Sequence, residues 1–207
     1  MTDVAMDSGR RARTKASNRA AILLAAREVF AELGYDAAGV RDVIRGTNLA
    51  SGTFYNYFAD KEAVFRAVLD ESAQEVRRRL REVRASAQTL EEFVGDAYRA
   101  WFSFLVEDEL MFKLMQRNAG PIRSLFGDPI LGAGVDELLD DLRAAISRGD
   151  LPPLDADYMA GAMAGAALEL GVRMAEREPA DVEGAARFAT QLFLGGIDRL
   201  AAGAQEA

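Results

Sequence analysis

The 207-residue sequence contains no cysteine and no histidine. Their absence excludes disulfides, thiolate and imidazole nucleophiles, and the usual zinc sites. Long apolar runs are also missing: residues 1–20 contain no signal-peptide core, and the most apolar stretch, residues 158–172, is interrupted by Glu169 and too short to cross a bilayer. Proline is scarce and half of the residues are hydrophobic, which is typical of a folded chain with a large core. We therefore expect a soluble, cytoplasmic protein with no metal, no cofactor and no membrane partner.

Charge is distributed unevenly along the chain. The net charge of −8 argues against a nucleic-acid partner, but residues 1–85 carry 15 Lys/Arg against 12 Asp/Glu, whereas residues 86–207 carry 10 against 21. A basic front and an acidic rear are typical of a DNA-binding module joined to a second domain. Chance variation of charge along the sequence is the alternative interpretation.

The segment SGTFYNYFADK, residues 51–61, has the pattern of a short helix with two different faces. At ~100° per residue, Phe54 and Phe58 fall on one side and form an inward-facing pair. Small side chains on the other side allow a helix to approach a duplex closely, while hydroxyl and amide groups can meet base edges and phosphates. This pattern is that of a recognition helix in a DNA major groove. Its outward face consists of Gly52, Thr53 and Asn56, flanked by Tyr55 and Tyr57.

Helices are also predicted on both sides of this segment. Residues 18–33 place their apolar side chains on one stripe, and Gly34 follows as a residue that can take the left-handed conformation at a helix end. Residues 40–45 form a second, short helix, and residues 47–49 form a tight turn in which Asn48 tolerates left-handed geometry. Asp60 can cap a long helix that continues to about residue 84. Two short helices about three residues apart predict a helix-turn-helix.

Two further clusters of basic residues have different expected roles. Residues 1–17 are predicted to be a flexible basic arm, which either adds phosphate or minor-groove contacts or only improves solubility. The arginines of residues 77–81 lie about 25–30 Å along the long helix from Lys61, at ~1.5 Å per residue. We therefore expect them to form a solvated face that can pair with the acidic second half, and not to contact nucleic acid.

The rest of the chain is predicted to be helical. Thr89 and Glu92 have the spacing of a capping box, and helices are expected at residues 90–106, 109–118, 136–148, 156–176 and 182–202, with a looser region at 120–134. No strand pattern or internal repeat competes. The predicted fold class is all-α, with an N-terminal three-helix helix-turn-helix domain at residues 18–62, joined by a long helix to a C-terminal helical domain at residues 63–207.

The segment GVRDVIRGTNLASGTFYNYFADKEAVF, residues 39–65, resembles the TetR/AcrR-like family of transcriptional regulators. The resemblance covers residues 18–65, and it covers the rear half only by helical layout and length. Gly39, Asn48 and Ala50 stand where the family usually has Thr, Gly and Ser, so Ser51 is expected either to cap the recognition helix or to leave its end frayed. The family string G-T-x-Y-x-[YH]-F-x-x-K is matched by Gly52, Thr53, Tyr55, Tyr57, Phe58 and Lys61.

The resemblance implies a DNA-binding transcriptional regulator, expected to be a repressor, that binds a palindromic double-stranded DNA operator as a dimer. Ser51, Gly52, Thr53 and Asn56 are then expected next to bases, and Tyr55 next to a base or a phosphate. For each outward residue, plain solvation is the alternative. The residues expected at or near phosphates are Tyr57, Lys61, Arg41, Arg45 and Thr47.

The C-terminal domain is expected to bind a ligand and to dimerise. In the resembled family, a pocket there holds an effector, and filling it shifts the helix that begins near Asp60. A small apolar effector suits the aromatic and methionine side chains of the middle helices, although such side chains also form ordinary cores. The expected pocket residues are Tyr98, Trp101, Phe102, Leu105, Met111, Phe112, Met115, Phe126 and Met163.

The last two helices are the expected homodimer seam, with packing inside one protomer as the alternative. Small residues allow close helix approach there, and larger ones supply apolar area. The seam is expected to use Gly161, Ala162, Gly165, Ala166, Gly195 and Gly196, with Leu168, Val172, Phe188, Leu192 and Phe193.

Two other functions compete with the regulator. An enzyme would need paired carboxylates such as those in residues 107–109 or 140–141, but these acids lie in runs near helix ends, and no histidine or cysteine accompanies them. We therefore expect that the chain is not an enzyme. A helical ligand carrier or protein-interaction module without DNA binding would not need the outward tyrosines and lysine of residues 55–61.

Overall fold

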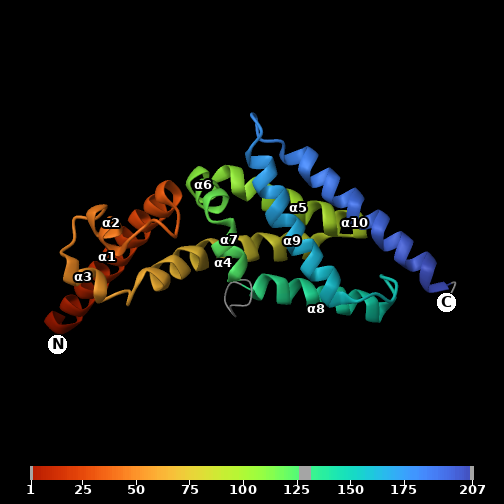
Figure 1. The fold of residues 1–207 in the computed structure, drawn as a ribbon. Helices are drawn as coiled ribbons and strands as arrows, with labels where there is room; N and C mark the ends of the chain where they lie inside the picture. Colours follow the sequence, from red (N-terminus) through yellow and green to blue (C-terminus); the bar gives the residue numbers. More distant parts are fainter. Residues whose placement is uncertain (1, 126–131, 206–207) are drawn as a thin grey trace.

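The computed structural model describes residues 2–125 and 132–205, and all regular structure in these two ranges is helical. The predicted all-α fold class is thus confirmed. Figure 1 shows an elongated molecule in which α1 to α3 lie at one end. Helix α4 runs from that end into the C-terminal domain, which α5 to α10 form. The N-terminal helices are α1 (Thr2–Leu33), α2 (Val40–Arg45), α3 (Ser51–Tyr55) and α4 (Lys61–Ser86). The others are α5 (Leu90–Glu107), α6 (Glu109–Arg117), α7 (Ala119–Ser124), α8 (Ala133–Arg148), α9 (Ala156–Ala175) and α10 (Val182–Gln205).

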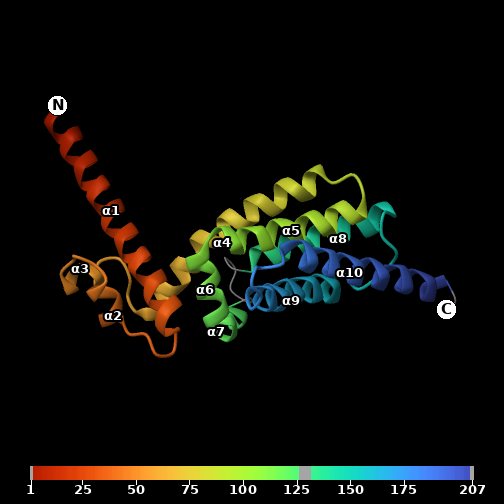
Figure 2. The same cartoon turned by 90° about the horizontal axis from the view of Figure 1, so that it is seen from above.

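The front of α1 differs from the predicted flexible arm. Residues 2–17 continue the same helix, and its first turns project beyond α2 and α3 (Figure 2). No proline interrupts residues 2–33, and Ala, Arg, Lys and Met are good helix formers. Because adding residues to an existing helix costs far less than starting one, the stable part at residues 18–33 can extend toward the N-terminus.

The ends of the N-terminal helices follow local rules. Gly34 takes the left-handed conformation with φ 81°, as predicted, and the Asp60 side chain accepts the Ala63 N–H at 2.8 Å and caps α4. Asp42 compensates for the missing cap side chain at Gly39 by accepting the Gly39 N–H at 2.8 Å. Asn48 does not use the left-handed conformation, since no non-glycine residue in the described ranges has a positive φ.

The core of the helix-turn-helix domain is aromatic. Phe54 and Phe58 are buried, as predicted, with ring centroids 5.9 Å apart. Phe30 of α1 meets Phe65 of α4 edge to face at 4.9 Å. Each such aromatic pair adds roughly 0.5–1.5 kcal/mol to the effect of burial. The first pair anchors α3 in the core, and the second joins α1 to α4.

A polar joint connects this domain to α6. Asn118, 1% exposed, donates to the carbonyl oxygens of Phe30 at 3.0 Å and Leu114 at 2.7 Å, and it accepts the Tyr35 N–H. Arg27 of α1 also pairs with Asp108, the N-cap of α6. The end of α1 is therefore bound to α6 as well as to α4.

The C-terminal helices lie close to their predicted bounds. The Thr89–Glu92 capping box is present, with Glu92 N–H donating to the Thr89 hydroxyl at 3.1 Å. The looser region contains one more short helix, α7, and Phe126 lies outside the described residues. No helix in the described part of the chain is long and apolar enough to span a membrane.

Candidate nucleic-acid interface and apolar cavity

The outward face of α3 is open to solvent. Tyr55 is 60% exposed, Ser51, Gly52 and Asn56 are exposed, and Thr53 is half-buried. Ala50 is the N-cap of α3 and offers no side-chain cap, so Ser51 is the first helical residue and does not take over the capping role. Hydroxyl, amide and phenol groups therefore point away from the fold.

The surroundings of Gly52 show that the fold does not require a glycine on the outward face of α3. A Cβ atom built at Gly52 would have no heavy atom within 4 Å, and its φ is not in the left-handed region. A larger side chain would thus meet nothing inside the protein. The absence of a side chain at this position matters only to something that approaches α3 from outside.

Three of the residues expected at phosphates also brace the domain. The Thr47 hydroxyl donates to the Ile44 carbonyl at 2.8 Å and accepts the Leu49 N–H at 3.2 Å, which shapes the turn before α3. Arg45 is exposed and paired with Asp42. The Gly39 N–H and Arg45 together hold the pKa of Asp42 below its usual value.

Lys61 is the third bracing residue. Its Nζ donates to the Tyr35 carbonyl at 2.7 Å and lies 4.3 Å from the centre of the Tyr35 ring. A lysine ammonium has three donors, so Lys61 can hold the turn between α1 and α2 and still offer a proton to an external acceptor. Arg41 is exposed on α2, and Tyr57 is half-buried against the core.

The front of α1 forms a shallow groove with the end of α3. The groove is lined by Arg10, Arg11, Thr14 and Lys15 of α1 and by Asn56 and Tyr57. Basic side chains therefore stand beside the polar end of the exposed face. These residues are helical, and they bring positive charge to the same side of the domain, where it favours an anionic partner.

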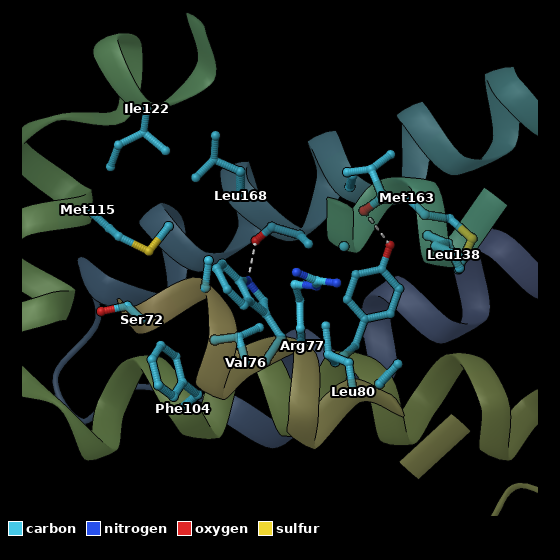
Figure 3. A pocket seen from close by; sticks show the side chains of 18 of the residues that line it. Ser72, Val76, Arg77, Leu80, Phe104, Met115, Ile122, Leu138, Met163 and Leu168 are labelled. Atoms are coloured by element: carbon cyan, nitrogen blue, oxygen red, sulfur yellow. Dashed lines mark hydrogen bonds between the residues drawn. The ribbon is translucent and has the colours of Figure 1, made fainter. Parts of the chain in front are cut away.

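A cavity of about 210 Å³ lies inside the C-terminal domain. It is bounded by α4, α5, α6, α7, α8 and α9, and its lining is largely apolar (Figure 3). For comparison, an apolar cavity of roughly 150 Å³ holds a benzene molecule. Burial raises the pKa of Tyr98, whose hydroxyl donates to the Met163 carbonyl at 2.9 Å, and Trp101 Nε1 donates to the Ala167 carbonyl at 3.0 Å.

Five of the nine expected pocket residues line this cavity: Tyr98, Trp101, Met111, Met115 and Met163. Phe102, Leu105 and Phe112 do not. Phe102 and Leu105 are buried and pack, together with Trp101, against Gly171 of α9, and Phe112 is half-buried against the core. When a helix is buried on both sides, its residue types do not show which face meets the cavity, and the prediction was therefore wrong for these three residues.

The contribution of α4 and α8 to the cavity was not predicted. The α4 residues Leu69, Ser72, Ala73, Val76, Arg77, Leu80 and Arg84 line the cavity, with Gly134, Val135 and Leu138 of α8. The apolar stripe of the long helix was available as a signal, but it gave no indication of which helix would cover it.

Most of the α4 arginines pair with acids of the second half, as predicted; Arg78 instead pairs with Glu75 and Glu82 of α4 itself. Arg79 binds Glu107 at 2.6 Å, and three other arginines bind α8. Two of them, Arg77 and Arg84, are not a solvated face, because they line the cavity and Arg84 has only 6% of its side chain exposed. We call the residues Arg77, Arg81, Arg84, Glu137 and Asp141 the α4–α8 ion network.

Part of α9 and α10 presents apolar side chains to solvent. Phe188 and Leu192 are more than half exposed, and nothing lies within 4 Å of a Cβ built at Gly161, Gly165, Gly195 or Gly196. The exposed set also includes Tyr158 and Leu200, which were not predicted. Leu168 and Phe193, predicted to lie in the seam, are instead buried in the protomer: Leu168 lines the cavity, and the Phe193 ring stacks on Tyr98 at 5.9 Å.

The helix-turn-helix region has recognisable relatives. Residues 22–68 match the model of a family described as "Bacterial regulatory proteins, tetR family", which confirms the resemblance for this region. The chain is 34% identical over 64 residues to the HTH-type transcriptional regulator UidR of Escherichia coli K12, which is 31% of this chain and 33% of UidR. It is 31% identical over 104 residues to the HTH-type transcriptional activator FasR of Mycolicibacterium smegmatis, or 48% of this chain and 46% of FasR. The chain therefore spans about a third to a half of the length of these curated relatives.

The whole fold is similar to that of a solved regulator. The transcriptional regulator FadR from Bacillus subtilis, crystallised in complex with stearoyl-CoA, matches with a TM-score of 0.73 and 24% identity over 85% of this chain and 97% of FadR. At this identity the likeness establishes the fold, which is an N-terminal helix-turn-helix with a C-terminal helical domain.

Proposed function

We propose that this chain, whose residues 22–68 match the tetR-family DNA-binding region, is a transcriptional regulator that inserts α3 into the major groove of an operator. The observation that carries the proposal is the exposed polar face of α3, which the fold has no need to keep small. Thr53, Asn56 and Tyr55 are then the groups closest to bases. Lys61, Tyr57, Arg41 and Arg45 contact phosphates, with Thr47 setting the turn.

Binding to a labelled random-sequence duplex, followed by fluorescence anisotropy at several salt concentrations, tests this proposal. We expect the logarithm of affinity to fall linearly with the logarithm of salt concentration, and the double variant Tyr55→Ala/Asn56→Ala to bind at least tenfold more weakly. Arg78→Gln/Arg79→Gln is the control, because those cations lie on the far part of α4 and pair with acids. Absence of duplex binding, or a loss confined to the control, would refute a nucleic-acid role for α3.

We also propose a homodimer through α9 and α10. One helix-turn-helix makes too few contacts to select an operator, and two-fold proteins read two half-sites. The seam is supported by exposed Phe188 and Leu192 next to glycines that leave room for a second backbone.

Leu192→Arg is expected to give monomers by light scattering, because it buries a charge in an apolar seam. Leu24 is the matched control, since both leucines are 54% exposed but Leu24 lies on α1. A dimer that survives Leu192→Arg, or is lost equally in Leu24→Arg, would move the interface elsewhere.

The cavity is the proposed effector site. It is apolar, and α4, which forms one wall, begins at Lys61 in the DNA-binding domain, so a ligand that prefers one position of α4 also selects one spacing of the two recognition helices. Such a ligand must favour that state by a few kcal/mol to change operator affinity. The complex of FadR with stearoyl-CoA supports an apolar or acyl-type effector.

A further inference from the structure

The charges that line the cavity all have the same sign. Arg77 and Arg84 are the charged residues of its described lining, and no carboxylate takes part. Arg77 lies among the lining side chains, with Met115 and Ile122 on one side and Leu138 and Met163 on the other (Figure 3). The other large polar groups, the Tyr98 hydroxyl and Trp101 Nε1, already donate to α9 carbonyls. The arginines are therefore the groups left to bind the polar part of a ligand.

Within the α4–α8 ion network each lining arginine has one carboxylate partner: Arg77 binds Glu137 at 2.5 Å, and Arg84 Nε binds Asp141 at 2.8 Å. The third guanidinium, that of Arg81, has 58% of its side chain exposed and does not line the cavity. The pairing in this network is loose at one point: Arg81 and Arg84 reach Glu137 at 3.6 and 3.8 Å, which is beyond hydrogen-bond distance. Guanidinium donors thus remain for a further acceptor.

Both arginines are held in place. The side chain of Arg84 is 6% exposed and its Nε donates to Asp141 at 2.8 Å. The aliphatic stem of Arg77 lies against Gly134 of α8: a Cβ atom built at Gly134 would be 3.4 Å from Arg77 Cγ. A buried guanidinium with further donors to offer favours an anion over a neutral group, and its planar fork suits a carboxylate.

We infer that the effector is an amphiphile with an apolar body and a single anionic group, such as a carboxylate, which binds Arg77 and Arg84. This inference rests on the proposed function in taking the cavity as the effector site. The apolar body lies toward Met115 and Ile122. The anion joins the α4–α8 ion network and competes with Glu137 for the arginines, so that ligand binding changes the contacts between α4 and α8.

The fluorescence of Trp101 provides a direct assay, because it is the one tryptophan of the chain and lines the cavity. The protein is titrated with octanoate and with octan-1-ol, and with decanoate and decan-1-ol, which differ only in the head group. We expect each carboxylate to bind at least tenfold more tightly than its alcohol. Native mass spectrometry confirms that the probe adds to the folded protein.

Three variants and one control test the assignment. Arg77→Met and Arg84→Met keep much of the length of the side chain and should abolish the preference for the carboxylate while leaving alcohol binding intact, which also shows that the cavity has folded. Arg78→Met is the matched control, because Arg78 pairs with Glu75 and Glu82 outside the cavity, and it should retain the preference. Glu137→Gln removes the competing carboxylate and should increase affinity for the acids only.

Equal or tighter binding of the alcohols, a carboxylate preference that persists in both arginine variants, or no binding of any probe would overturn the inference. Because no DNA is present in the assay, these outcomes leave duplex binding to be judged separately. If the protein binds the acids but no duplex, the proposed DNA-binding function is refuted and the inferred ligand class is not.

Discussion

Replacing Gly52 by alanine separates what α3 needs for folding from what it needs for DNA binding. The added methyl group meets no atom within 4 Å, and the backbone there is not left-handed. Alanine is a better helix former than glycine by roughly 0.5–1 kcal/mol. For a domain of this size, the melting temperature should therefore rise by roughly 1–4 °C.

The same substitution should weaken DNA binding. The methyl group would stand between the α3 backbone and the bases, with a cost comparable to a mismatched base pair, about 1 kcal/mol or more in each half-site. Two half-sites in a dimer give about 2 kcal/mol, or roughly a thirtyfold loss of affinity.

Melting curves at equal protein concentration and anisotropy titrations with the preferred duplex measure both effects. Gly120→Ala is the matched control, because Gly120 also faces open space but lies on α7, and it should leave DNA affinity unchanged. If Gly52→Ala binds as tightly as wild type, α3 does not approach a duplex closely. If it lowers the melting temperature, Gly52 has a role in the fold that the structure does not account for.

Three further predictions concern single residues that join helices, face DNA or take part in ion pairs. Asn118→Ala removes the donor to the Phe30 and Leu114 carbonyls and leaves the Tyr35 N–H unpaired, so unfolding free energy should fall by about 2–4 kcal/mol in chemical denaturation. Lys61→Met should reduce the salt slope of duplex binding by ~0.9 for each phosphate that the lysine ammonium neutralises in the wild type. Arg78 and Arg79 lower the pKa of Glu75 to about 2 from 4.5, so its contribution to stability is complete above pH 4.5 and disappears as pH falls through about 2. The difference in stability between wild type and Glu75→Gln should therefore shrink between about pH 5 and pH 2.

A different result would contradict each of these predictions. Gln116→Ala, an exposed position on α6, the helix that Asn118 caps, should change stability by less than about 0.5 kcal/mol. An equal loss in both variants would show that the hydrogen bonds of Asn118 do not account for its effect. An unchanged salt slope in Lys61→Met would show that Lys61 neutralises no phosphate and that its role is the contact with Tyr35. A constant difference between wild type and Glu75→Gln across that pH range would contradict the arginine pairing of Glu75.

Local signals in the sequence were sufficient for most of the fold. The bounds of α2 were predicted from its short apolar stripe, and α4 and α5 from the caps at Asp60 and Thr89, because capping depends on residues three positions apart. The same is true of buried Phe54 and Phe58. By contrast, the helical state of residues 2–17 was not predicted, because polar residues without an apolar stripe carry no packing signal even though their helix propensity is high.

Features that depend on a second helix could not be predicted from one helix alone. Phe193 is the same residue type as the exposed Phe188 on the same helix, but it faces Tyr98 because of how α10 lies on α5. The prediction of a solvated face was wrong for Arg77, since a run of arginines gives no sign that α8 and a cavity lie beside it. Which side of a helix is covered is a property of the assembled fold.

Selection from a pool of random duplexes is the measurement that tests the central claim most directly, since it asks whether an exposed α3 reads DNA sequence in a two-fold protein. We expect enrichment of an inverted repeat whose half-sites are separated by about one helical turn or a whole number of turns, with altered preference in Thr53→Val and Asn56→Ala. Recovery of no common sequence, or of the same sequence by the wild type and both α3 variants, would contradict it.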